Sequence, residues 1–119
     1  VPTSPSLITR VTVDAIQATI KKREWPKGIY HLVPRGVSSW HEIAQTLIDY
    51  AGCQDIRQKF RVKVIQAIAT ADYPTAVKRP LNSQLDTNKI RMQLSFDLPY
   101  WKDDFLDVAK EIFKELKVV

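Results

Sequence analysis

Proline divides this chain into the segments that can be helical. A proline inside a helix removes a backbone hydrogen bond and clashes with the preceding turn, so helices must lie between prolines or begin at one. The prolines of this 119-residue chain stand at positions 2, 5, 26, 34, 74, 80 and 99. This spacing predicts several short helices joined by turns and loops, and the length fits a single domain over residues 1–119.

The first helix is predicted to begin at Ser4 and Pro5. A serine can cap the first turn, and proline suits the first helical position because its missing N–H would have no partner there. The pattern predicts a helix to about Arg23 that stops before Pro26. Its expected apolar face consists of Ile8, Val11, Ala15, Ile16 and Ile20.

A second helix is predicted to follow Ser39. Ser39 can cap a backbone amide of the first turn while the side chain of Glu42 reaches back to the amide of Ser39. Gly52 is expected to end this helix in a left-handed conformation. The expected apolar face consists of Trp40, Ile43, Ala44, Leu47, Ile48 and Ala51.

Two more helices are predicted towards the C-terminal end. Asp86 or Thr87 is expected to cap a short helix that runs to about Leu94, and Leu98-Pro99 should interrupt the chain before the last helix. The last helix has an acidic first turn and a basic last turn, as the helix dipole favours. Its expected apolar face consists of Phe105, Val108, Ala109, Ile112, Phe113 and Leu116.

Two runs, residues 28–33 and 62–68, have the composition of β-strands. Two short strands do not make an independently stable sheet. We therefore expect them to extend a sheet supplied elsewhere or to pair within a small helix-dominated lobe. The predicted fold class is α/β, as a helix-rich lobe of about four helices and two or three short strands.

The net charge of +5 raises the question of a polyanionic partner. Proteins that bind nucleic acid usually concentrate basic residues and interleave aromatic ones. Here the basic residues are spread along the chain, so we expect no nucleic-acid partner. We also expect no membrane span, because no apolar run approaches the ~20 residues that one needs. No signal peptide is evident, and the single cysteine fits a reducing cytoplasm.

The sequence shows no self-sufficient catalytic centre. The glycines, at positions 28, 36 and 52, do not form the Gly-rich turn that a dinucleotide needs, and no tyrosine is followed four positions later by lysine. His31, His41 and Cys53 are expected to be structural, and the acidic residues of 103–107 to begin a helix. We therefore predict no catalytic, cofactor-binding or metal-binding residue in this chain.

The loop from Tyr73 to Lys89 is the strongest candidate for binding. It is interrupted by prolines and presents Arg79, Asn82 and Ser83. Arginine offers a planar set of donors suited to phosphate, and the amide and hydroxyl can bond sugar hydroxyls or a base edge. In the structural alternative, Arg79 pairs with a nearby aspartate and the other two residues only shape a turn.

The chain resembles the C-terminal part of the dTDP-4-dehydrorhamnose reductases, which are extended short-chain dehydrogenases. Motifs typical of that family occur in order along nearly the whole chain. Leu94-Ser95-Phe96 replaces a usual Phe-Gly, and Ala76-Val77 replaces a usual Pro-Ala. The matching elements are Pro2-Thr3-Ser4, Gly28 to Leu32, Gly36 to Trp40, Tyr73 to Leu85, Asp86 to Lys89, and Leu98 to Trp101.

The resemblance implies an enzyme that uses NADPH or NADH to reduce the C4 ketone of dTDP-6-deoxy-L-lyxo-4-hexulose, giving dTDP-L-rhamnose. An N-terminal Rossmann domain, absent from these residues, would hold the cofactor and the catalytic groups. Residues 1–119 would be the substrate-binding lobe for the dTDP-sugar. By this analogy Arg79 contacts the diphosphate, and Asn82 and Ser83 orient the nucleotide-sugar. A homodimer is also possible.

Two other interpretations remain open at this point. A regulatory relative without reductase activity could share the same lobe, because a fold alone does not establish chemistry. Alternatively, the chain is a free-standing basic domain that binds a polyanion, which would show as a strong dependence of binding on salt.

Overall fold

Helices make up nearly all of the regular structure in the part of the chain that the structure describes. The computed structural model describes residues 1–21, 25–54 and 61–118. The elements are α1 (Pro5–Ile20), α2 (Trp40–Gly52), the 3-10 helix η2 (Thr70–Asp72), α3 (Asn88–Arg91) and α4 (Trp101–Val118). The prediction of a helix-rich lobe with about four helices is confirmed over these residues.

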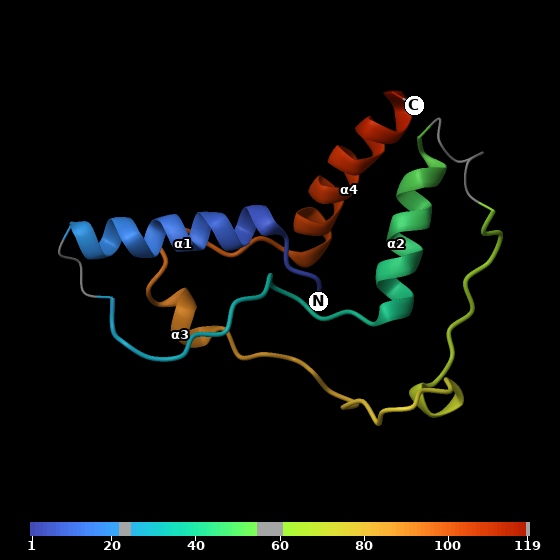
Figure 1. Cartoon of the computed structure of the whole chain (residues 1–119), viewed down its shortest axis with the longest axis horizontal. Helices are drawn as coiled ribbons and strands as arrows, with labels where there is room; N and C mark the ends of the chain where they lie inside the picture. Colours follow the sequence, from blue (N-terminus) through green and yellow to red (C-terminus); the bar gives the residue numbers. More distant parts are fainter. Residues whose placement is uncertain (22–24, 55–60, 119) are drawn as a thin grey trace.

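The helices form two groups that meet near the start of α4 (Figure 1). One group contains α1, α3 and the loops around them, and its buried apolar residues are Leu7, Val11, Ile90 and Leu98. In the other group, α2 lies beside α4 and buries Ala51 and Phe113. The radius of gyration is 17.8 Å, whereas a compact domain of this length has about 13.5 Å. The chain is therefore open, with two small cores in place of one large core.

Helix α1 begins as the sequence predicts. The Ser4 Oγ accepts a hydrogen bond from the Leu7 amide at 3.0 Å, and Pro5 occupies the first helical position. The described helix ends at Ile20, and positions 22–24 lie outside the described residues.

The predicted apolar face of α1 is mostly wrong. The buried residues are Leu7, Val11, Asp14 and Ala18, so only Val11 of the predicted face is buried. The isoleucines Ile8, Ile16 and Ile20 are exposed. The helix carries apolar side chains on two faces, and its polar contacts, described next, decide which face turns inward.

Two aspartates hold α1 against the rest of the molecule. The carboxylate of Asp104, in the first turn of α4, accepts hydrogen bonds from the backbone amide of Ser4 at 2.9 Å and from its hydroxyl at 2.6 Å. The buried carboxylate of Asp14 accepts hydrogen bonds from the amide of Ser95, at 3.0 Å, and from its hydroxyl. Ser95 belongs to the Leu94-Ser95-Phe96 departure from the family pattern, so this departure supplies a hydroxyl for the packing of α1.

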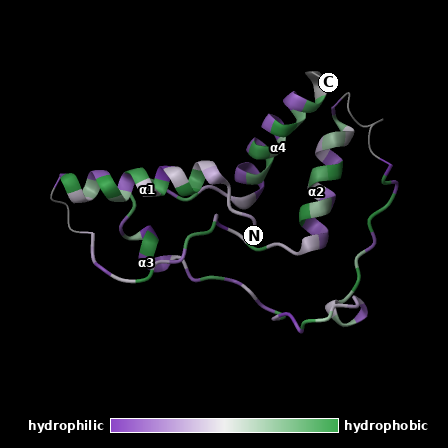
Figure 2. Ribbon diagram, viewed as in Figure 1, coloured by the Kyte–Doolittle hydropathy of each residue, from purple (hydrophilic) through white to green (hydrophobic). Residues whose placement is uncertain are grey.

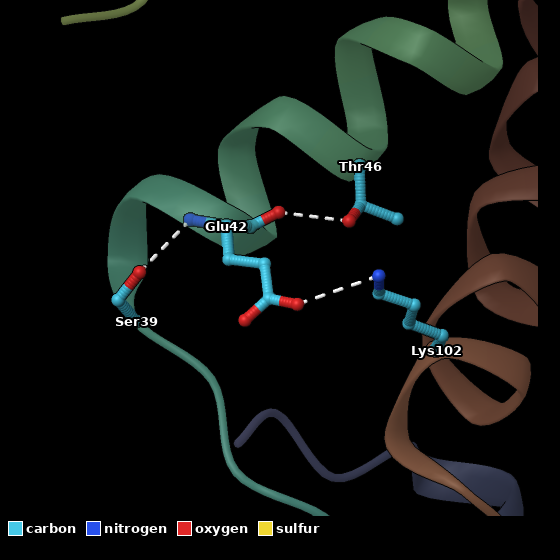
Figure 3. A network of polar contacts seen from close by, with 4 residues as sticks. All are labelled: Ser39, Glu42, Thr46 and Lys102. Carbon is cyan, nitrogen blue, oxygen red and sulfur yellow. Dashed lines mark hydrogen bonds and ion pairs between the residues drawn. The ribbon is translucent and has the colours of Figure 1, made fainter. Parts of the chain in front are cut away.

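Helix α2 begins at the predicted cap and is joined to α4 by an ion pair (Figure 3). The Ser39 Oγ accepts a hydrogen bond from the Glu42 amide at 3.1 Å. The Glu42 carboxylate lies 3.3 Å from the ammonium group of Lys102, and no described hydrogen bond joins it to the Ser39 amide. The first half of the predicted capping box is therefore confirmed, while the glutamate pairs with the neighbouring helix.

Three details of the predicted helices differ from the structure. Gly52 is the last residue of α2 and has no positive φ, and the helix ends with Cys53 as its cap. Trp40, predicted on the apolar face of α2, is 79% exposed. Helix α3 is capped through the Asp86 carboxylate, which accepts from the Asn88 amide at 2.8 Å, and it ends at Arg91, earlier than predicted.

Helix α4 begins after the predicted break and buries Trp101, Ala109 and Phe113. Ile112 and Leu116, which the sequence places on the apolar face, are about half exposed. Figure 2 shows hydrophobic and hydrophilic residues interspersed along both α2 and α4. The buried residues between these two helices are Ala51 and Phe113.

The two predicted strands are not formed in the described residues. Residues 28–33 keep the side-chain alternation of a strand: Tyr30 and Leu32 pack on the first core, while Ile29 and His31 are exposed. Residues 62–68 run in an extended path beside α2, held by a contact between the His41 Nε2 and the Ile65 carbonyl at 3.2 Å. Among the described residues neither run has a neighbouring strand to accept its backbone hydrogen bonds, and a strand exists only as part of a ladder.

Replacing Asp14 with alanine should destabilise the fold by about 2–4 kcal/mol, because hydrogen bonds to a buried charged group contribute strongly. Chemical denaturation followed by circular dichroism would measure this loss. Asp107→Ala is the matched control, since Asp107 is 74% exposed and pairs only with Lys110. The hydrogen bond and charge of Asp107 raise the pKa of Lys110, but water screens this exposed pair. Equal losses for both variants would contradict the assigned role of Asp14.

Replacing Ser39 with alanine should cost about 1 kcal/mol of stability, because an amide of the first turn of α2 loses its acceptor. Replacing Glu42 with glutamine should cost less than about 1 kcal/mol, since both side chains of its ion pair are more than 40% exposed. Denaturant midpoints of the two single variants would compare these effects. A larger loss for Glu42→Gln would show that the ion pair, and not the cap, holds α2 in place.

Candidate functional site

The signature loop lies on the surface. Every residue from Tyr73 to Asp86 is exposed, and the segment runs from the far side of α2 back towards α3 (Figure 1). Asp86 and Thr87 then lead into α3. An exposed loop held at its end by a helix can present its side chains to a ligand.

A hollow of about 580 Å³ brings the end of this loop against a second segment with a family motif. One wall is formed by residues 33–39, which connect the first core to α2, and the other by residues 81–85, together with Thr87 and Arg91. The two walls are more than forty positions apart in the sequence. Val1 completes the lining.

Hydrogen bonds fix the first wall to the start of α4. The Arg35 amide donates to the Pro99 carbonyl at 2.8 Å, and the Arg35 carbonyl accepts from the Trp101 amide at 2.9 Å. The Nε of Arg35 also donates to the carbonyl of Leu98 at 2.7 Å. This short parallel bridge holds the backbone of the wall on two buried residues, Leu98 and Trp101.

Gly36 allows the first wall to pack closely. Its φ is +99°, a conformation that other residues rarely adopt. A Cβ at this position would lie 2.5 Å from Cε2 of Tyr100 and 2.8 Å from Cδ1 of Trp101. The hollow therefore depends on glycine at this position, for both its backbone and its lack of a side chain.

Local turns shape the second wall. The Asn82 Oδ1 accepts a hydrogen bond from the Gln84 amide at 2.9 Å, an Asx turn that leaves the NH₂ group of Asn82 available. Asp86, whose carboxylate caps α3, does not line the hollow. Arg91 is the last residue of α3, and no described residue forms a hydrogen bond or ion pair with its side chain.

The lining is suited to an anion. Two cations, Arg35 and Arg91, are among the described residues that line it, and none of these residues carries a carboxylate. Ser38 lines it too, but its hydroxyl oxygen is buried, without a hydrogen-bond partner among the described residues, and is not exposed to a ligand. The two cations and the amide of Asn82 point to a polar, negatively charged ligand with hydroxyl or carbonyl groups.

The structure brings two of the three predicted site residues together in this hollow. Asn82 and Ser83 line it, whereas Arg79 is exposed and does not. No described ion pair joins Arg79 to an aspartate. Sequence reasoning missed Arg35 and Arg91: no role was predicted for the first, and the second was interpreted only as part of a short helix. The nearby Gly36–Trp40 motif was the available signal for Arg35.

A larger hollow, of about 670 Å³, lies at the C-terminal end of α2. Its described lining contains none of the residues of the signature loop. We therefore take the smaller hollow, where two motif segments meet, as the candidate site. Among the described residues no group of three or more His, Cys, Asp and Glu side chains could hold a metal ion. No helix in the same residues is both long and apolar enough to span a membrane.

Residues 1–114 match the family model described as the RmlD substrate binding domain. The chain belongs to this family. A dTDP-4-dehydrorhamnose reductase of Escherichia coli is 32% identical over 112 residues, which cover 94% of the chain and 36% of that protein. The reductase of Aggregatibacter actinomycetemcomitans is 34% identical over 101 residues, which cover 85% and 34%. The Bacillus subtilis spore coat polysaccharide biosynthesis protein SpsK is 26% identical over 100 residues, which cover 84% and 32%.

This RmlD substrate binding domain spans about a third of the length of the curated relatives that it matches. No solved structure matches it. The family assignment favours a role in handling the substrate of such a reductase over a free-standing basic domain.

The residues of the domain do not fit a nicotinamide dinucleotide. Such a cofactor lies on a Gly-rich turn between a strand and a helix. In the described residues no strand precedes a helix, and Gly28 and Gly36, which have positive φ, lie in separate loops.

Replacing Gly36 with alanine should destabilise the domain by about 2–4 kcal/mol, because it combines backbone strain with overpacking against two aromatic rings. Thermal and denaturant unfolding would measure the loss. Gly52→Ala is the matched control, since Gly52 is helical without a positive φ and alanine is favoured there. A stable Gly36→Ala variant would contradict the close packing of this wall on α4.

Proposed function

We propose that this chain is the nucleotide-sugar-binding part of a dTDP-4-dehydrorhamnose reductase. In the proposed reaction the complete enzyme reduces the C4 ketone of dTDP-6-deoxy-L-lyxo-4-hexulose with NADPH or NADH and forms dTDP-L-rhamnose. The observation that carries the proposal is the hollow where the family motifs at 36–40 and 73–85 meet. Its lining has free donors and two cations, with no carboxylate.

In this proposal the signature loop binds the dTDP-sugar. Asn82 and Ser83, which line the second wall of the hollow, orient the sugar or base. Arg79 lies outside the lining but only three positions before Asn82 in an exposed loop. It contacts the diphosphate from the side that faces away from the hollow.

The rest of the enzyme supplies the chemistry. A Rossmann domain in another part of the protein would hold the nicotinamide cofactor and the catalytic groups, since the present residues do not fit that cofactor. The open shape supports this arrangement, because two small cores leave many apolar side chains uncovered. The runs 28–33 and 62–68 would then complete their backbone hydrogen bonds in a sheet of the complete protein.

The physical role of this part is orientation and exclusion of water. A ligand held at both its diphosphate and its sugar presents one face of the ketone, which removes much of the entropic cost of reaching the transition state. The single cysteine, Cys53, is exposed and free, which is compatible with the reducing cytoplasm that we propose as its location.

Replacing Arg79 with alanine in the complete protein should raise KM for the dTDP-sugar by about tenfold or more, since a charge-assisted contact to the diphosphate is lost. Affinity for NADPH should stay nearly unchanged, because the cofactor would lie in the other domain. Steady-state kinetics and a cofactor titration would measure both quantities.

Arg61→Ala is the matched control for this change. Arg61 is also an exposed arginine, and it does not line the hollow. It should leave both constants unchanged. Equal kinetics for Arg79→Ala and the parent protein would remove Arg79 from the site, and a complete protein that does not oxidise NADPH or NADH with this substrate would refute the proposed activity.

A further inference from the structure

Hydrogen bonds fix both the backbone and the side chain of Arg35, which is rare for an arginine on the surface. Its backbone amide and carbonyl both bond to the 99–101 segment, at 2.8 and 2.9 Å. Its Nε donates to the carbonyl of buried Leu98 at 2.7 Å. The guanidinium is thus oriented from the inside, while its terminal N–H groups have no partner among the described residues.

Arg91 reaches the same hollow from the opposite wall. It stands at the end of α3, next to buried Ile90, which packs in the first core. This position fixes its backbone, and its side chain has no ion pair among the described residues. The lining contains no acidic side chain that would neutralise either arginine.

We propose that Arg35 and Arg91 together bind the phosphate oxygens of a nucleoside diphosphate in this hollow. This inference rests on the proposed function and assigns its anion contact to residues outside the signature loop. Two guanidinium groups on opposite walls can each donate two parallel hydrogen bonds to a phosphate. A diphosphate carries enough charge and enough oxygens for both.

Pre-orientation makes Arg35 a stronger contact than Arg79. A ligand that binds Arg79 must order an exposed side chain in an exposed loop, which costs rotamer entropy. The guanidinium of Arg35 is already fixed through Nε, so binding orders less of its side chain. Asn82 and Ser83 then lie beside the diphosphate in the same hollow, in position to contact the groups attached to it.

The test is titration calorimetry of the complete protein with three probes: dTDP, inorganic pyrophosphate and thymidine. The variants are Arg35→Gln, Arg91→Gln and Arg79→Gln. Lys114→Gln, which removes the same charge from an exposed site on α4, is the control. We expect each of the first two variants to weaken the binding of dTDP and pyrophosphate by about thirtyfold or more. Arg79→Gln should weaken it by about tenfold, and Lys114→Gln should not weaken it.

Arg35→Gln also removes a structural hydrogen bond, so two comparisons keep the result interpretable. Arg91 is exposed and makes no such bond, and Arg91→Gln should retain the parent's thermal unfolding midpoint while losing affinity. Arg35→Lys keeps the charge but lacks both Nε and the planar donor pair, so it should recover only part of the lost affinity.

The outcomes separate this inference from the proposed function. If the parent protein binds dTDP and both glutamine variants bind it equally well, the arginine pair is refuted while the nucleotide-sugar function stands. If pyrophosphate binds through both arginines but dTDP does not bind, the anion site stands and the nucleotide-sugar function fails. If neither dTDP nor pyrophosphate binds the parent protein, both proposals are refuted.

Discussion

The hydrogen bonds between Arg35 and residues 98–101 position the elements that surround the candidate site. Three hydrogen bonds from one residue cross more than sixty positions of sequence and fix a loop on buried Leu98 and Trp101. That loop forms one wall of the hollow and leads directly into α2. The same segment begins α4, whose Asp104 holds the start of α1. Without these hydrogen bonds, few contacts would connect the two small helix groups.

Hydrogen bonds between polar groups determine much of the helix packing in this molecule. The apolar cores are small, so the placement of α1 depends on two aspartates that each accept two hydrogen bonds from a serine. Such contacts are directional, whereas apolar burial is not. They therefore select which face of a helix turns inward when both faces carry apolar residues. The inward face of α1, with Asp14 at its centre, illustrates this.

The candidate site has one anchored wall and one exposed wall. Residues 33–39 are anchored on α4, while residues 73–85 are exposed along their whole length. A ligand between them would contact one rigid wall and one adaptable wall. In the proposed function, the anchored wall would limit the ordering cost of binding a large nucleotide-sugar.

Local sequence signals determined the positions of the helices. Ser4-Pro5, Ser39 and Asp86 each act within a few residues, through a cap or a fixed φ, so they mark the starts of α1, α2 and α3 without knowledge of the rest of the fold. The motifs around Asn82 and Ser83 likewise pointed to a binding loop. These features depend on neighbours in the chain, which the sequence shows directly.

The tertiary structure decided everything that depends on distant residues. It turned Asp14 inward on α1, paired Glu42 with Lys102, left residues 28–33 and 62–68 without a partner strand, and placed Arg35 and Arg91 in one hollow. Each of these outcomes needs a partner far away in the chain, and no periodicity or local motif encodes which partner that is. The sequence by itself therefore determined the helices and the family, and only the fold decided which charged residues line a common hollow.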